Sequence, residues 1–208
     1  MQSQATDAEP QVTPESLRSE SLREAFRHLH GSRLHGFALL VSLGDARRAE
    51  RAASEALASG EARATSLRHP ERAAAWVRAQ VVPKLRRARR PDRTDAAARR
   101  VALRGLGVDE AAFDGLAALD FDARVAFVAS SIERFAPLDI ETILGAGPAA
   151  THRAIERARR RYLSVVAGPP EGDGPSPSAG ADLEGELARR VRTVAERALS
   201  GARSTGFA

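Results

Sequence analysis

Arginine is concentrated in one short stretch of this chain. Residues 148–163 hold five arginines and a single acidic residue, Glu156. A guanidinium group can donate two hydrogen bonds to O6 and N7 of guanine, or it can neutralise a backbone phosphate. A charged run is also common on any solvated helix face. We favour contact with DNA because of the elements on which these arginines lie.

Those elements are two short helices, predicted on either side of a glycine turn. Pro137 suits the first position of a helix, and Asp139 then lies near the positive end of the helix dipole. Gly145 and Gly147 are expected to end this helix and to supply the unusual backbone angles of a tight turn, after which Pro148 starts the second helix. The apolar positions of the first helix follow helical spacing, at Ile140, Ile143 and Leu144.

The second helix has a side that should pack and a side that should be charged. The spacing places the first set together at Thr151, Ile155, Ala158 and Tyr162. It places the second set together at Arg153, Arg157 and Arg160. This arrangement is typical of a helix-turn-helix, whose second helix enters the major groove of DNA.

The composition points away from catalysis and from metal binding. The chain has 208 residues, a net charge of +5 and no cysteine, which excludes disulfides, thiolate nucleophiles and zinc ribbons. His28, His30 and His35 lie close in sequence, but side chains two apart on a helix diverge, so we expect no metal site. Phosphate-binding loops and nucleophile elbows are absent from the sequence. We therefore expect no enzymatic activity and no cofactor.

The sequence also predicts a cytoplasmic protein without a membrane partner. It contains no apolar run of the roughly 18 residues that a membrane span needs, and its N-terminus lacks the pattern of a signal peptide. A second basic cluster, at residues 84–104, holds nine basic residues against two acidic ones. Arginine-rich composition alone could produce this total, so its clustering is the informative property.

An all-α fold is expected, because no segment alternates apolar and polar residues as a strand would. We divide the chain into a disordered arm (1–12), a first helical domain (13–91), a second helical domain (94–166), a linker (167–181) and a C-terminal amphipathic helix (182–200). The C-terminal helix is either a fraying appendage or a docking element, and the sequence favours neither.

The first domain is predicted to contain four helices. The first should start at Thr13 and Pro14 and run to about His30, with Leu22, Phe26 and Leu29 on its apolar side. The second is expected to follow Gly31 and to stop at Gly44, the third to run from Asp45 to about Ala58, and the fourth from Pro70 to Pro91. In the second domain, helices are expected at 95–105, 109–118 and 121–134 before the helix-turn-helix.

Four segments match the motifs of one family in order and spacing. Leu144–Arg159 aligns without gaps with a family pattern of Leu-Gly, a short turn and a closing Arg-Ala-Arg. Leu119–Arg124 resembles the family segment that precedes this pattern. Gly44–Glu55 and Pro70–Val77 resemble two motifs of the first domain. The chain thus resembles the bacterial RNA polymerase sigma factors of the sigma-70 family, in the extracytoplasmic-function branch, over about residues 20–165.

The resemblance implies a region 2 domain that binds polymerase and the minus-ten element, and a region 4 domain that inserts a helix at the minus-thirty-five element. Its partners would be promoter DNA and core RNA polymerase, and an anti-sigma regulator is a further partner that it allows. The implied groove-facing residues are Thr151, His152, Arg153 and Arg157, with Arg160 and Arg161 on phosphates. Lys84, Arg86 and Arg87 would lie along the DNA in region 2. Polymerase would contact Glu50, Arg51, Ser54 and Glu55.

Several positions depart from the family pattern. Arg51 and Ser54 stand where the family has Asp and Gln, and Pro83 lies inside a predicted helix. Trp76 is the only aromatic residue between positions 45 and 112, and we expect it in the core. DNA melting needs planar side chains that stack on flipped bases, so this domain is poorly equipped for it. An alternative hypothesis is therefore a diverged sigma-like protein that acts as a protein-interaction module without promoter melting.

Overall fold

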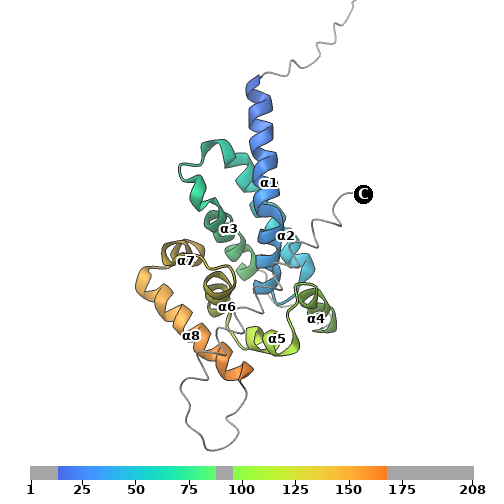
Figure 1. The fold of residues 1–208 in the computed structure, drawn as a ribbon, viewed down its shortest axis with the longest axis vertical. Coiled ribbons are helices and arrows are strands. Elements are labelled where there is room, and N and C mark those ends of the chain that lie inside the picture. Colours follow the sequence, from blue (N-terminus) through green and yellow to red (C-terminus); the bar gives the residue numbers. More distant parts are fainter. Residues whose placement is uncertain (1–13, 88–95, 168–208) are drawn as a thin grey trace, which may run out of the picture.

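The computed structural model describes residues 14–87 and 96–167, and every regular element in these ranges is helical (Figure 1). The α-helices are α1 (Pro14–Val41), α2 (Ala46–Arg63), α3 (Ala73–Arg87), α4 (Ala96–Arg104), α5 (Glu110–Ala117), α6 (Phe121–Phe127), α7 (Pro137–Leu144) and α8 (Pro148–Val166). The predicted all-α fold is confirmed. The arm at 1–12, the linker beyond Ala167 and the helix at 182–200 lie outside the described residues.

Helix α1 corrects the prediction of two helices separated at Gly31. It is continuous through that glycine, so three α-helices, and not four, occupy the described part of the first predicted domain. A Cβ atom at Gly31 would lie 3.5 Å from Leu57 Cδ2 of α2, so α2 packs beside the position at which the sequence alone suggested a stop. A glycine inside a helix costs only about 1 kcal/mol relative to alanine, which tertiary contacts can offset.

The apolar side of α1 was also predicted only in part. Phe26 is buried, with 8% of its surface exposed, whereas Leu22 and Leu29 are 51% and 65% exposed. The N-terminal part of α1 projects beyond the other helices in Figure 1. Leu29 is exposed although Phe26 and His30, on either side of it in sequence, are buried.

Helix α2 begins where the sequence predicted, and α3 begins at Ala73, three residues after the predicted start at Pro70. Asp45 caps α2, and its side chain accepts a hydrogen bond from the backbone N–H of Arg48 at 3.1 Å. The helix continues to Arg63, beyond the predicted end near Ala58. Pro70 opens a short 3-10 turn (Pro70–Arg72) that leads into α3.

Two residues of α3 have notable positions. Pro83 lies inside the helix on its exposed face, and without an N–H it cannot donate the helical hydrogen bond to the carbonyl of Ala79. Trp76 packs against the core but is only partly buried, and the Arg63 guanidinium lies 5.6 Å from its ring centroid.

The second half of the described chain is built from short helices with clear caps. Asp109 caps α5 and Asp120 caps α6, each by accepting a backbone N–H at 2.8 Å. A π-helical turn (Val128–Ile132) continues α6, so the expected helix at 121–134 exists with a changed geometry near its end.

All eight α-helices of the described ranges contribute to one contiguous apolar core. Leu34, Phe37 and Val77 from the first predicted domain belong to the same buried cluster as Leu116 and Tyr162 from the second. Burying a large apolar side chain stabilises a fold by about 1.5–3 kcal/mol, so this shared core holds the two halves together. The proposed domain boundary at residues 91–94 falls outside the described residues, and the two-domain layout is not confirmed.

Candidate nucleic-acid interface

Helices α7 and α8 form the predicted pair around a three-residue turn. Pro137 and Pro148 occupy the first turns of their helices, and Gly145 caps α7 in the left-handed conformation with φ of 64°. Gly147 is different from expectation, because its φ of −74° and ψ of 167° are ordinary extended values open to any residue. Only one of the two glycines is therefore required by backbone geometry.

One face of α8 is fixed in the core. Tyr162 is 2% exposed and stacks on Phe127, with 4.2 Å between ring centroids. Helix α5 comes so close that a Cβ atom at Gly115 would lie 2.6 Å from Tyr162 Cε2. Burial raises the pKa of the Tyr162 hydroxyl to about 12, so this side chain stays neutral. The packing face predicted from spacing is confirmed, with Thr151, Ala158 and Tyr162 buried and Ile155 partly buried.

Thr151 is a correction to the predicted groove contacts. Its side chain belongs to the packing face, is 2% exposed and has a buried hydroxyl without a hydrogen-bond partner. With its hydroxyl buried, this side chain offers no accessible surface to a base edge. The family pattern suggested a groove contact here, whereas the helical spacing of the same sequence already placed Thr151 on the buried side.

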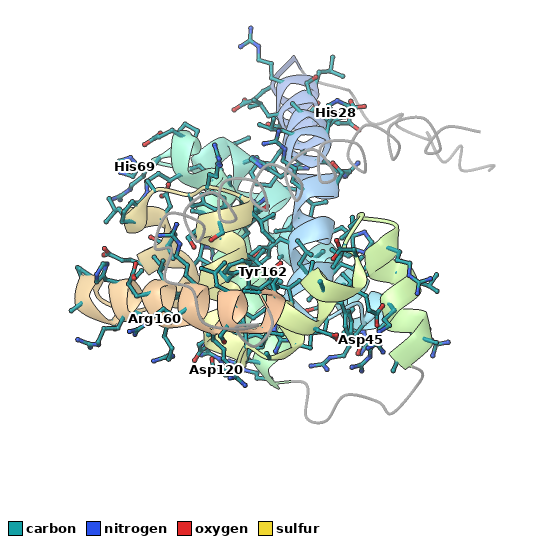
Figure 2. The ribbon with its side chains drawn as sticks, turned by 60° about the horizontal axis from the view of Figure 1, so that its bottom comes forward. His28, Asp45, His69, Asp120, Arg160 and Tyr162 are labelled. Carbon is teal, nitrogen blue, oxygen red and sulfur yellow. The ribbon has the colours of Figure 1, made fainter. Side chains whose placement is uncertain are left out.

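The opposite face of α8 is exposed and basic. Figure 2 shows Arg160 on the side of α8 away from the helical body, while Tyr162 points into it. The other predicted contact residues on this helix are also exposed, namely His152, Arg153, Arg157 and Arg161. Arg157 lies 4.0 Å from Asp120, and both side chains are more than half exposed. The stripe is therefore open to a large anionic partner.

The second predicted DNA-binding set lies at the C-terminal end of α3. Arg87 is exposed, Arg86 is paired with Asp122, and its guanidinium lies 5.6 Å from the Phe121 ring centroid. Lys84 donates a hydrogen bond to Glu55 at 2.6 Å. This contact lowers the pKa of the Glu55 carboxyl, first through the hydrogen bond and then through the charge of Lys84.

The predicted polymerase contacts share one exposed face of α2. Glu50, Arg51, Ser54 and Glu55 are all exposed, and alanines on the other side of α2 are buried. Since Glu55 binds Lys84, this face adjoins the basic end of α3. The two predicted contact sets of the first domain are thus neighbours.

Arg72, in the turn that leads into α3, connects that turn to α7. Arg72 donates to Asp139 at 2.9 Å, to the Leu138 carbonyl at 3.1 Å and to Thr142 Oγ1 at 2.9 Å, all on α7. These partners lie 66 to 70 residues away in sequence, and no local pattern predicts them.

A buried ion pair makes a second connection between the halves. Arg78 on α3 donates from Nε and Nη2 to the two carboxylate oxygens of Glu133, which follows the π-helical turn. The rings of Phe37 and Phe135 lie 5.6 and 4.9 Å from the Arg78 guanidinium. Burial raises the pKa of the Glu133 carboxyl, and the Arg78 charge opposes that rise. Together with the Arg72 contacts, this pair joins α3 and the turn before it to α7 and to the segment that follows α6.

Three of the five histidines lie on α1, namely His28, His30 and His35. Within residues 14–87 and 96–167, no group of three or more histidine, aspartate or glutamate side chains could hold a metal ion. His28 and His35 are exposed, whereas His30 is buried, with its ring centroid 4.5 Å from that of Phe26. None of the described helices has the length and apolar character that crossing a bilayer requires.

Comparison with protein families and with curated proteins returned no match. The interface therefore has to be interpreted from its own geometry and from the motifs in the sequence.

Proposed function

We propose that this chain is a sigma-factor-like transcription protein, which binds promoter DNA through α7 and α8 and core RNA polymerase through the exposed face of α2. It would act in the cytoplasm and catalyse no reaction of its own. The observation that carries this proposal is the exposed arginine stripe of α8. The stripe lies on one face of α8, and the other face of this helix is buried in the core. A three-residue turn joins α8 to α7.

The geometry suits a major groove. Arg153, Arg157 and Arg160 recur at helical spacing, so they point to the same side over roughly 10 Å of helix length. A helix held at one angle by a shorter neighbour can present such side chains to base edges and phosphates at the same time. The partly exposed ring of Trp76 is covered by Arg63, which gives little support for capture of flipped bases and favours contact with intact duplex.

The test is a binding titration with purified protein and duplex DNA over a range of salt concentrations. Replacement of Arg153 or Arg157 by alanine should remove about 1–3 kcal/mol of base discrimination if the residue binds a guanine. It should lower the salt slope by about 0.9 for each phosphate that is no longer neutralised. Arg23→Ala, on the projecting part of α1, is the matched control, because Arg23 is an exposed arginine distant from α8.

A transcription assay with core polymerase distinguishes a functional sigma factor from a protein-interaction module. Initiation by the wild-type protein supports a functional sigma factor. If only Arg51→Asp, which restores the acidic residue of the family pattern, permits initiation, the chain is a diverged member with a weakened polymerase contact. If the protein neither binds DNA nor supports initiation, it is a protein-interaction module, and the proposal is refuted.

A further inference from the structure

The N-terminal turn of α6 lies between the two basic sets. Asp120, its capping residue, is 4.0 Å from Arg157 of α8. Asp122, two residues later, is paired with Arg86 of α3, which also lies over the Phe121 ring. The arginine stripe of α8 and the basic end of α3 are therefore adjacent to the same turn. Figure 2 places Asp120 beside α8, on the side where Arg160 projects.

These ion pairs are open to exchange with another anion. The side chains of Arg157 and Asp120 are 58% and 65% exposed, and those of Arg86 and Asp122 are 50% and 54% exposed. Exposed ion pairs of this kind contribute little to folding, since solvent screens them and ordering two side chains costs entropy. A DNA phosphate can replace either carboxylate without unfolding any element.

We infer that the end of α3 and the stripe of α8 form one continuous binding surface for a single short stretch of duplex DNA, with Asp120 and Asp122 competing against the phosphates. This inference rests on the proposed function, since it extends the same interface. Its basis is the juxtaposition of Arg86 and Arg157 around one helical turn. The Arg72 and Arg78 contacts keep that juxtaposition fixed.

A continuous surface differs measurably from two independent domains. Independent domains would each occupy their own DNA segment, so a short duplex would engage only one of them. Helix α8 has 19 residues and is about 28 Å long, less than one turn of B-DNA. A duplex of about 15 base pairs is therefore long enough for α8 and the adjoining end of α3 together, and both sets should affect its binding.

The experiment measures binding of the full chain to a duplex of about 15 base pairs by fluorescence anisotropy at several salt concentrations. Arg86→Ala and Arg87→Ala should each weaken binding, and the salt slope should fall by about 0.9 for each phosphate left without its cation. Asp120→Asn and Asp122→Asn should tighten binding about two- to fivefold, because each removes a competing carboxylate. Asparagine also caps helices well, so Asp120→Asn preserves the start of α6.

Glu24→Gln is the matched control for loss of a carboxylate, since Glu24 is exposed on α1, and its binding should equal that of the wild type. Weakening by Arg153→Ala and Arg157→Ala without any effect of Arg86→Ala and Arg87→Ala would overturn the continuous surface and leave the proposed function standing. Unchanged affinity in all four arginine variants would overturn both. Unchanged affinity in both aspartate variants would overturn the competition.

Discussion

The buried pair of Arg78 and Glu133 gives a quantitative test of how α3 is joined to the second half of the chain. Only 3% of the Arg78 side chain and 15% of the Glu133 side chain are exposed. Two guanidinium N–H groups are bound by the carboxylate, and a third donates to the Ala74 carbonyl at 2.9 Å. Glu133→Gln would leave the guanidinium buried without its counter-charge.

Removing one partner of a buried ion pair costs about 3–5 kcal/mol, because the remaining charge keeps its desolvation penalty. For a chain of this length such a loss lowers the melting temperature by roughly 6–20 °C. The double variant Arg78→Met/Glu133→Met removes both charges and should recover most of the lost stability, since apolar residues of similar volume can replace a buried pair. Urea unfolding followed by circular dichroism measures all of these free energies.

The control is Glu61→Gln, which breaks the pair of Arg27 and Glu61. That pair has a short contact of 2.7 Å, but the Arg27 side chain is 60% exposed. Water can therefore solvate the arginine when its partner is removed, and the cost should be far smaller. A loss of stability for Glu133→Gln no larger than that for Glu61→Gln would refute the argument that burial makes the Arg78 pair decisive.

Two further predictions concern buried polar groups. Thr151→Val removes a buried hydroxyl that lacks a hydrogen-bond partner, so the free energy of unfolding should rise by about 1 kcal/mol. The affinity for DNA should not change, and weaker DNA binding would show that Thr151 contacts the groove. Burial, followed by the charges of Arg78 and Arg33, lowers the pKa of His30 below its ordinary value of 6.5, so the neutral form is favoured by folding. The contribution of His30 to stability is then complete above pH 6.5 and decreases as the pH falls from 6.5 through the folded-state pKa. His30→Gln should reduce this loss. Unfolding midpoints measured at pH 7.5 and at pH 5.5 would detect it. Parallel pH profiles of the wild type and His30→Gln would contradict this.

Much of the candidate interface could be predicted because its determinants are local. Asp45, Pro137 and Pro148 act on the backbone within one helical turn, and each lies where the sequence placed it. The two faces of α8 follow from the period of the helix, so spacing alone separated Tyr162 from the arginines. The family pattern and the spacing disagreed at Thr151, and burial supports the spacing.

The sequence by itself determined the helical class, most helix starts and the amphipathic character of α8, because propensity, capping and period act between residues a few positions apart. The tertiary structure decided whether Gly31 breaks α1, since that depends on what packs beside it. It also decided which charges meet. Arg78 and Glu133 are 55 residues apart, and Arg86 and Asp122 are 36 apart. Such pairs depend on the packing of whole helices, and any of the many arginines in the chain could have filled the same role by local criteria.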